Sequence, residues 1–505
     1  MNRTRKFLYN TLATSGYQLA AMLMGFVTPR LMMAFYGSEI NGLVVSITDF
    51  INYFKLVEAG LATAAVYSLY KPLADKDAEG VSAIVSAARR FYNVSGYLFI
   101  ALTALFALIY PFVVSCRSLD ALSVGFLVLI MGVSGALEFF TLSRYRVLLT
   151  ADQKTYVVSL ASMASLIAQT AIIALLAVCR VNVLLLRLFA GLTILLRSGI
   201  LYAYVRKHYP YVNYKAAPNK AALASRWDAL YRQLINSLQQ SLGVTLTTLI
   251  LRDASVVSVY GTYHMVIMGL WGILKMVTTG IYSLFGEMLV KGQQAVMRRA
   301  YRDFEYLYLS LCTVIYATCS VMILSFVRIY THGVTDADYI QPLWAALLVL
   351  QGMSDQLKLP LDMMVTAAGK FRETRHYNTA QVVIAVGLGA LLGFLFGVPG
   401  IIIGLIAANL TRTALQLYFV PKNITGIPAV KTLARQGRCY LTVGVTFGLW
   451  QLVPWAPANI FQWLAMAVIC AASAGILTVG MGILFDREGL MGLTRRAQSL
   501  LKRGK

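Results

Sequence analysis

The chain has 505 residues, of which 58% are hydrophobic and 13% charged, and its mean hydropathy is +0.68. Because soluble domains carry roughly 25% charged residues, this composition excludes a soluble globular protein and predicts an integral membrane protein. The net charge of +23 and the pI near 9.8 are typical of nucleic-acid-binding proteins. Such binding needs a soluble basic domain, for which the apolar stretches leave no room, so no nucleic-acid partner is expected.

Apolar stretches long enough to cross a bilayer follow one another almost end to end. A spanning helix needs about 20 apolar residues. On that basis we predict an all-α membrane protein with fourteen spans, at residues 8–34, 40–68, 85–113, 121–142, 156–178, 183–205, 230–251, 255–288, 303–329, 340–366, 378–397, 399–420, 433–453 and 459–484. Only Pro399 and Gly400 separate the eleventh span from the twelfth, so thirteen spans is the alternative count.

The basic start of the chain, from Asn2 to Lys6, precedes an apolar run and so imitates a secretory signal peptide. Residues 8–34 are too long and too polar for the apolar core of such a signal, and no clear small-x-small cleavage site is present. We therefore expect this stretch to remain as the first span.

Lysine and arginine residues alternate with the predicted spans. With the N-terminus inside, the inner segments hold 33 of the 44 Lys and Arg residues, including Arg144, Arg146, Arg435 and Arg438, and the outer segments hold five. The remaining six fall within spans and are Arg30, Lys55, Arg197, Lys275, Lys358 and Arg412. This alternation follows the positive-inside rule. It predicts cytoplasmic termini, with the excess positive charge against anionic membrane lipids.

Three landmarks recur at nearly equal spacing in the two halves of the chain. Thr150–Lys154 recurs as Thr366–Lys370. Lys55 lies 99 residues before Lys154, and Lys275 lies 95 residues before Lys370. Arg197 and Arg412 follow those two lysines by 43 and 42 residues. Matched landmarks indicate an internal duplication, which is typical of transporters.

The duplication predicts the domain organisation. The domains are a six-helix lobe at 1–205, a cytoplasmic linker at 206–229, a second six-helix lobe at 230–421, two additional spans at 422–485 and a basic cytoplasmic tail at 486–505. Because six is even, we expect the lobes to be related by an axis along the membrane normal. In the tail, Leu490, Leu493, Ala497 and Leu501 share one helical stripe among basic residues, which predicts a helix on the inner membrane surface. A merely solvated basic tail is the alternative.

Sequence motifs of enzymes, nucleotide sites and metal sites are missing. There is no GxxxxGK[ST], HExxH or GxSxG pattern, the four histidines are scattered and the six cysteines occur singly. We therefore expect no cofactor and no metal. The cysteines are expected to be buried, with an outer disulfide between Cys116 and Cys179 as the alternative. The short outer loops, of which 330–339 is the longest, argue against a membrane glycosyltransferase or ligase because they leave little chain for an acceptor site.

Two lysines lie near the middle of predicted spans, Lys55 in the second and Lys275 in the eighth. A central lysine costs about 2.5–3.5 kcal/mol on insertion scales, so both side chains must face protein or water. Lys55 has Glu58 one turn away and Asp49 about two turns away, whereas Lys275 has no partner predicted within its own helix. We predict that both lysines line a cationic cavity, and structural pairing with acids is the alternative.

The tenth span places Asp355, Lys358 and Asp362 on one face of a helix that Pro360 breaks. An internal salt-bridged ladder is the interpretation that we favour. A coupling-ion or proton site is the alternative, because clustered carboxylates inside a membrane often relay cations. Asp49 and Glu58 complete this candidate charge network.

Three arginines lie nearer the ends of their predicted spans. Arg197 and Arg412 are in the inner halves, where we expect their long side chains to snorkel to the headgroups. Arg30 follows Pro29 near the outer end of the first span, so outward snorkelling and a place in the cavity are equal alternatives. Pro29 is expected to bend that helix.

A cavity lined by Lys55, Lys275 and Arg30 would be positive and would attract phosphates and carboxylates. A lipid diphosphate that carries sugars fits such a cavity. The cations would hold the diphosphate, the sugars would lie in water, and the lipid tail would stay in the bilayer.

Fourteen spans in two like sets of six, followed by two more, resemble the multidrug/oligosaccharidyl-lipid/polysaccharide (MOP) exporter superfamily. Short motifs look like its polysaccharide branch, the Wzx-type flippases of O-antigen and capsule repeat units. They are Asn10–Leu12 through Pro29–Arg30, Tyr36–Leu43 and Glu58–Leu61. The resemblance covers nearly the whole chain.

This resemblance implies a MATE-like, V-shaped pair of lobes around a cavity that opens alternately to each face. It implies transfer of an undecaprenyl-diphosphate-linked oligosaccharide from the inner to the outer leaflet, with polysaccharide polymerase and assembly proteins as partners. In the related lipid II flippase, cations on the first, second and eighth spans line the cavity. Arg30, Lys55 and Lys275 lie on those spans here. The lysines stand where arginines are usual, and a lysine does not grip phosphate bidentately.

Two other transport functions stay open. Cation-coupled drug antiporters share the fold and typically rely on acids in a lobe. The first span here has no acid, and Lys55 and Lys275 would repel cationic drugs, but Asp355 and Asp362 keep that function open. A lipid II-type peptidoglycan precursor flippase is the second alternative.

Overall fold

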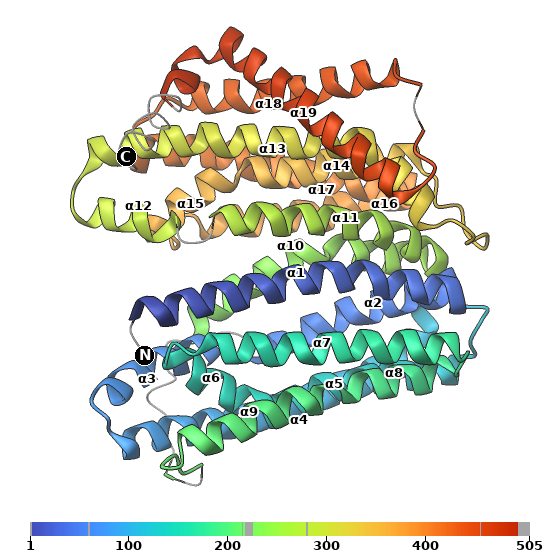
Figure 1. Ribbon diagram of the computed structural model, residues 1–505, viewed down its shortest axis with the longest axis vertical. Helices are drawn as coiled ribbons and strands as arrows, with labels where there is room; N and C mark the ends of the chain where they lie inside the picture. The colour runs from blue at the N-terminus through green and yellow to red at the C-terminus, as the bar shows by residue number, and fades with distance from the viewer. Residues whose placement is uncertain are drawn as a thin grey trace. The chain divides into compact units, whose positions relative to one another are not determined.

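A computed structural model describes residues 3–58, 61–214, 216–217, 226–278, 281–454 and 456–492. Within these ranges the protein is built from helices, and the one strand-like feature is an isolated bridge between Ser115 and Asp253 (Figure 1). The predicted all-α class is confirmed.

Within the described ranges, the first half of the chain supplies nine α-helices and two irregular turns. They are α1 (Arg3–Tyr36), α2 (Ser38–Phe54), the 3₁₀ turn η1 (Lys55–Glu58), α3 (Leu61–Ala74), α4 (Ala78–Val113), α5 (Ala121–Leu137), the π-helical turn η2 (Glu138–Leu142), α6 (Ser143–Ala151), α7 (Thr155–Val178), α8 (Val183–Leu192) and α9 (Ile194–His208).

The second half supplies ten α-helices within the described ranges. They are α10 (Arg226–Leu251), α11 (Ala254–Thr278), α12 (Ile281–Val290), α13 (Gln294–Tyr330), α14 (Pro342–Leu357), α15 (Leu359–Ala367), α16 (Arg375–Phe396), α17 (Val398–Val420), α18 (Ala429–Gln451) and α19 (Ile460–Phe485), with a π-helical turn η4 (Pro421–Thr425) after α17.

Eleven helical stretches in the described part of the chain are long and apolar enough to cross a membrane. The other three predicted spans coincide with α10, with the broken pair α14 and α15, and with α18. The short helices α3 and α12 begin within the second and eighth predicted spans. The protein is therefore a multi-pass membrane protein whose helical stretches match the fourteen predicted spans.

The eleventh and twelfth spans are two separate helices. α16 and α17 meet at Gly397, whose φ of +65° belongs to the left-handed region that favours glycine. A Cβ on Gly400 would lie 1.9 Å from the carbonyl oxygen of Leu392, and one on Gly404 would lie 2.4 Å from the Cα of Gly389. Such close backbone approach is typical of small residues between membrane helices. The alternative count of thirteen spans is therefore wrong.

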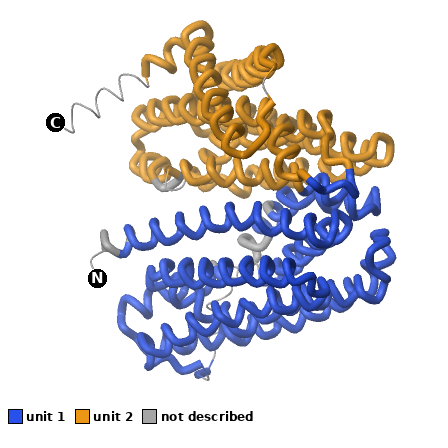
Figure 2. Tube along the Cα trace, turned by 45° about the vertical axis from the view of Figure 1, so that its right-hand side comes forward, with its two compact units in different colours: residues 1–261, 333–337 blue, residues 262–332, 338–505 orange. Residues whose placement is uncertain are grey.

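The chain divides into two compact units (Figure 2). The first comprises residues 1–261 and 333–337, and the second comprises residues 262–332 and 338–505. The lobe boundaries predicted from the duplication, 1–205 and 230–421, stay predictions. Three predicted segments lie partly outside the described ranges. The residues concerned are 59–60 of the Glu58–Leu61 motif, 215 and 218–225 of the linker, and 493–505 of the tail.

The start of α2 packs tightly within the first unit. Gly37 has a φ of +86°, and the following Ser38 donates from its backbone N–H and its hydroxyl to Asp336, each at 2.6 Å. A Cβ on Gly42 would lie 1.7 Å from the carbonyl oxygen of Ala254, so α2 and α11 touch through their backbones. The Tyr36–Leu43 motif is therefore a close-packing site between α2, α11 and residues 333–337.

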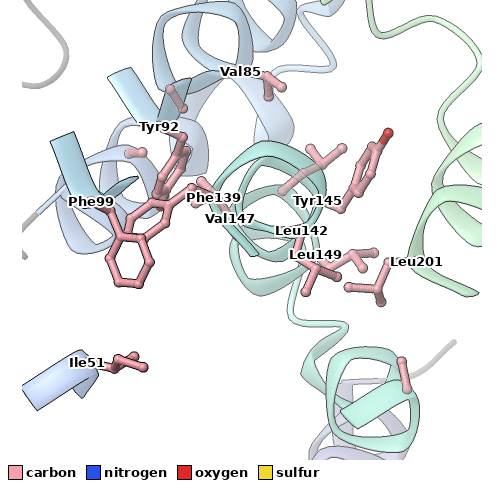
Figure 3. Packing of buried hydrophobic residues seen from close by; sticks show 14 of the residues in the cluster. Ile51, Val85, Tyr92, Phe99, Phe139, Leu142, Tyr145, Val147, Leu149 and Leu201 are labelled. Atoms are coloured by element: carbon pink, nitrogen blue, oxygen red, sulfur yellow. The ribbon is translucent and has the colours of Figure 1, made fainter. Parts of the chain in front are cut away.

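Aromatic side chains of α4, η2 and α6 form much of the core of the first unit. Tyr92 and Phe99 are fully buried, and the ring centroids of Phe99 and Phe139 are 5.3 Å apart. Figure 3 shows Tyr92, Phe99 and Phe139 on one side of the α6 region and Tyr145 and Leu201 on its other side. Because lipid tails are as apolar as these side chains, close packing holds such helices together. This core holds the π-helical turn η2 in place, and η2 begins with Glu138, a charged residue of the candidate site.

The repeated segments Thr150–Lys154 and Thr366–Lys370 adopt the same turn. The residue before each lysine has a positive φ, +56° at Gln153 and +67° at Gly369. The backbone N–H groups of Lys154 and Lys370 donate back to the preceding helices at 2.8 and 3.1 Å. The repeat is thus confirmed as a pair of matching turns after the fourth and tenth spans.

All six cysteines are free thiols. Cys312, Cys319, Cys439 and Cys470 are buried, as predicted. Cys116 is partly buried, and the prediction is wrong for Cys179, which is exposed because it caps the end of α7.

Candidate functional site

Lys55 and Lys275 each stand where a helix ends. Lys55 begins η1 directly after α2, and Lys275 lies in the last turn of α11. The next helix, α3 or α12, begins six residues after the lysine in both cases. Both lysines also begin the pattern Lys-x-Val-x-x-Gly. Both lysines therefore lie shortly before a short helix, at matched positions in the two halves of the chain.

The partner of Lys55 is Glu138, the first residue of η2. The Lys55 Nζ lies 3.2 Å from Oε2 of Glu138. The alternative pairing of Lys55 with Glu58 is wrong, because Arg146 reaches Glu58 from α6 and donates to it at 2.9 Å. The alternative pairing with Asp49 is equally wrong within the described part of the chain, where the only ion pair of Lys55 is the one with Glu138.

Glu138 is the centre of a cluster of charged side chains. Besides Lys55, Nη1 of Arg146 and Nη1 of Arg197 lie 3.4 and 3.7 Å from Oε1 of Glu138. Together with Glu58 these residues form the Glu138 cluster, which contains three cations and two carboxylates and thus one net positive charge. Lys55 has the most exposed side chain of the five, at 37%, and Glu138 the least, at 15%.

Two arginines of the cluster correct expectations from the charge distribution. Arg146 was expected in an inner loop, but helix continues through η2 and α6 to Ala151 and places the guanidinium between Glu58 and Glu138. Arg197 was expected to snorkel to the headgroups, and it lies instead beside Glu138 with 19% of its side chain exposed. Partly buried acids therefore decide where these cations point.

Lys275 belongs to the second unit and has an exposed side chain. Its Nζ lies 4.8 Å from the centroid of the Trp271 ring, one turn earlier on α11. A cation over an aromatic face gains about 0.5–1 kcal/mol at exposed sites. The expectation that Lys275 has no partner within its own helix is therefore wrong, because tryptophan was not counted as a partner for a cation.

A second network joins α14, α15 and α17 in the second unit. Lys358 binds Asp355, as the ladder prediction requires. Asp362, however, binds Arg412 and Gln416 on α17 in place of Lys358. Arg412 is buried, so its expected snorkelling is wrong. The two cations and two carboxylates of this network balance, and the predicted ladder becomes two ion pairs that Asn409 and Gln381 connect by hydrogen bonds.

Arg30 and Asp49 lie outside the ion pairs of the Glu138 cluster. Arg30 is half-buried on α1, which continues as one helix through Pro29. Asp49 is half-buried on α2 and accepts a hydrogen bond from Ser241 of α10. Their expected roles in a cavity or in ion coupling stay predictions. Within the described ranges no group of three or more His, Cys, Asp or Glu side chains is arranged to hold a metal ion.

Comparison with known proteins identifies the fold. No family model and no curated protein matches the sequence. The solved structure of the lipid II flippase MurJ in an inward closed conformation aligns with a TM-score of 0.64 and 12% identity, over 95% of this chain and 99% of that one. An inward-facing MATE family multidrug transporter of the MOP superfamily aligns with a TM-score of 0.63 and 12% identity, over 86% of this chain and 99% of that one. The eukaryotic MATE transporter AtDTX14 aligns with a TM-score of 0.58 and 14% identity, over 86% and 98%.

The chain has the MATE-like fold of the MOP transporters.

The comparison confirms the MATE-like fold that the sequence resemblance implied, and it leaves the V-shaped lobes, the cavity and the polysaccharide branch as predictions. The fold also contains a third charged network, which was not predicted. Arg435 donates to Glu305 at 2.7 Å and to Asp486 at 2.6 Å, and Arg438 lies over the Tyr306 ring. These contacts tie α13, α18 and the end of α19 together. Acids at the ends of the ninth and fourteenth spans were the signal that could have identified this network.

Asp152 has a structural role in the turn after α6. It accepts hydrogen bonds from Tyr209 at 2.5 Å and from Lys6 at 3.4 Å, and it pairs with Lys154 at 2.9 Å. Partial burial works to raise the pKa of the Asp152 carboxyl, but the Tyr209 hydrogen bond and the two lysines outweigh it and hold the pKa below its usual value. In the MATE-like fold of this chain, Asp152 joins the start of α1, the repeated turn and the residue after α9.

Proposed function

We propose that this chain is a flippase. It moves an undecaprenyl-diphosphate-linked oligosaccharide from the inner to the outer leaflet of a bacterial cytoplasmic membrane by alternating access, for cell-surface polysaccharide biosynthesis. The observation that carries the proposal is the positive excess of the Glu138 cluster, with Lys55 as its most exposed member.

An anionic cargo suits this excess charge. A cation inside a membrane is costly unless an anion or water compensates it, so a site with one uncompensated positive charge favours a negative ligand. A phosphate group offers several oxygens that accept charge-assisted hydrogen bonds from a lysine. A cationic drug would meet repulsion at Lys55 and gain nothing from Glu138, which three cations already surround.

Lys275 supports the same cargo from the second unit. Its exposed ammonium lies beside Trp271, so a diphosphate held by the lysine would place attached sugars near an indole ring. Aromatic faces pack against the apolar faces of sugar rings, whereas the ammonium binds the anion. Arg30 is the third proposed cation for the cargo.

The two candidate coupling acids of the second unit, Asp355 and Asp362, already have partners, which argues against the drug-antiporter alternative. Asp355 is bound by Lys358, and Asp362 is bound by Arg412. An acid that trades cations has to release its internal partner first, which makes coupling at these two acids costly. A flippase is further supported by the extent of the alignment, because MurJ covers 95% of this chain and the MATE transporters 86%.

A lipid II-type precursor is the second candidate cargo, and the likeness to MurJ favours it. Both cargoes are diphosphates of a long-chain lipid, so the cationic residues do not distinguish them. We further propose that anionic lipids contact the basic face and that polysaccharide polymerase and assembly proteins are partners.

Reconstitution into liposomes tests this function. Purified protein is placed in vesicles with a fluorescent lipid-diphosphate oligosaccharide, a fluorescent lipid II or a cationic dye, and the change of leaflet or efflux is followed. We expect transfer of the lipid-diphosphate oligosaccharide and no movement of the dye. Dye efflux without lipid transfer would establish the antiporter alternative, and transfer of lipid II alone would establish the precursor flippase.

A further inference from the structure

Three cations from three different helical segments converge on one carboxylate in the first unit. Oε2 of Glu138 faces Lys55 alone, whereas Oε1 faces both Arg146 and Arg197. The carboxylate therefore has two distinct sides. Its Oε1 side is held by two arginines on α6 and α9, and its Oε2 side carries the lysine at the helix break after α2.

The contact between Lys55 and Glu138 is exposed enough to exchange. Charge-assisted N–H···O bonds are usually 2.7–2.9 Å long. The three contacts with Glu138 are all longer, at 3.2 Å from Lys55, 3.4 Å from Arg146 and 3.7 Å from Arg197. Lys55 is also the most exposed residue of the cluster. Of the cations around Glu138, Lys55 is thus the one that a ligand can reach.

The backbone at Glu138 is irregular. Glu138 begins the π-helical turn η2, and the hydroxyl of Ser143 donates to its carbonyl oxygen at 3.2 Å. A π-helical turn within an α-helix is rare and is frequently found at functional sites. Phe139, the next residue of the turn, is buried against Phe99, so the apolar core holds this turn in place.

We propose that Glu138 is a built-in counter-anion that competes with the cargo for Lys55. In the empty carrier Oε2 of Glu138 neutralises the ammonium. A diphosphate then replaces Oε2 at Lys55, while Arg146 and Arg197 keep Glu138 in position. This inference rests on the proposed function, because it assigns a role to one residue in binding that same lipid diphosphate.

A carrier that returns empty needs a counter-charge for Lys55, and such a competitor supplies it. A bare ammonium in the bilayer interior is expensive. An internal carboxylate lowers that cost when the cargo has left, and it also weakens cargo binding so that release on the far side is easier. Glu138 is in this view a residue that sets affinity, and Arg146 and Arg197 are positioning residues.

Equilibrium binding tests the competition directly. Full-length protein in nanodiscs of zwitterionic lipid is titrated with undecaprenyl diphosphate. The variants are Glu138→Gln, Lys55→Gln, the double variant and Glu287→Gln. Glu287 is the control because its carboxylate forms an exposed pair with Lys291 and does not belong to the Glu138 cluster.

Removal of the competitor is expected to tighten binding. We expect Glu138→Gln to bind the lipid about fivefold more tightly than the wild type, in the usual range of coupling between sites. We expect Glu287→Gln to stay within about twofold of the wild type. The double variant should bind as weakly as Lys55→Gln, because the gain requires Lys55.

Three results would overturn the proposal: unchanged or weaker binding by a folded Glu138→Gln, a gain that persists in the double variant, or an equal gain in Glu287→Gln. If Glu138→Gln does not fold, Glu138→Asp withdraws the carboxylate by one methylene while keeping its charge, and the same gain or its absence decides. Binding by the wild type without a gain in either Glu138 variant rejects the competition alone. Absence of binding by every variant, the wild type included, rejects the proposed function as well.

Discussion

Arg197 and Arg412 occupy the same position in the two halves of the chain, and each binds a carboxylate of the helical stretch that ends at the repeated turn. Arg197 reaches Glu138, and Arg412 reaches Asp362. The two halves differ in the partner of the matched lysine. Lys55 joins the carboxylate of the first half, whereas Lys275 lies over Trp271. The duplication thus kept an arginine–acid pair and changed what surrounds it.

The Asp362–Arg412 pair is expected to stabilise the fold. Because Arg412 is buried, replacing Asp362 by Asn leaves a buried charge without its partner. Such a loss costs about 3 kcal/mol. We expect Asp362→Asn to lower the thermal midpoint in detergent clearly. Lys431→Gln breaks an exposed pair with Glu488 and should cost less than about 0.5 kcal/mol. Equal midpoints for the two variants would contradict this role.

Gly42 and Gly25 provide a matched pair on neighbouring helices. A Cβ on Gly42 would overlap the backbone of Ala254, whereas one on Gly25 meets nothing within 4 Å. We expect Gly42→Ala to destabilise by about 1–3 kcal/mol through overpacking. Gly25→Ala should stabilise by about 0.5–1 kcal/mol because alanine is the better helix former. Thermal unfolding of both variants checks the difference. A Gly42→Ala protein as stable as the wild type would show that α2 and α11 are not in contact.

Asp152 predicts a pH-dependent contribution to stability. Its pKa in the folded protein is lower than in the unfolded chain. The stabilisation is therefore fully present above the unfolded pKa of about 3.9 and is lost as the pH falls through the lower pKa of the folded state. We expect Asp152→Asn to lower the unfolding midpoint at pH 7 and to converge on the wild type below about pH 4. A difference that is constant from pH 7 to pH 3 would show that the carboxylate charge is not involved.

Cys179 reports on the predicted orientation. It is exposed at the end of α7, which the positive-inside rule places at the outer surface. In a variant that retains Cys179 as its sole cysteine, a membrane-impermeant maleimide added to intact cells should label the protein. A variant that retains only the buried Cys312 serves as the control and should stay unlabelled. Labelling of Cys179 only after the cells are opened would show that the orientation is opposite to the predicted one.

Features that depend on local sequence were predictable. The span lengths, the matched turns and the Lys358–Asp355 pair follow from neighbouring residues, because hydropathy and helical periodicity are local. The partners of Lys55 and Arg412 lie 83 and 50 residues away, and no periodic pattern connects them. The prediction that Arg146 lies in an inner loop was wrong for a related reason. The positive-inside rule counts cations as loop residues, and a partly buried acid can hold a cation inside a span.

The central claim is that Lys55 holds the diphosphate of a lipid-linked oligosaccharide during its transfer between leaflets. The most direct test is the initial rate of that transfer in proteoliposomes that contain equal amounts of wild type or Lys55→Gln. Lys291→Gln is the control, because Lys291 forms only an exposed pair with Glu287 within the described residues. We expect Lys55→Gln to be at least about tenfold slower, since a hydrogen bond to a charged group contributes about 1.5–3 kcal/mol. The control should keep the wild-type rate. Transfer by Lys55→Gln at the wild-type rate would contradict the account.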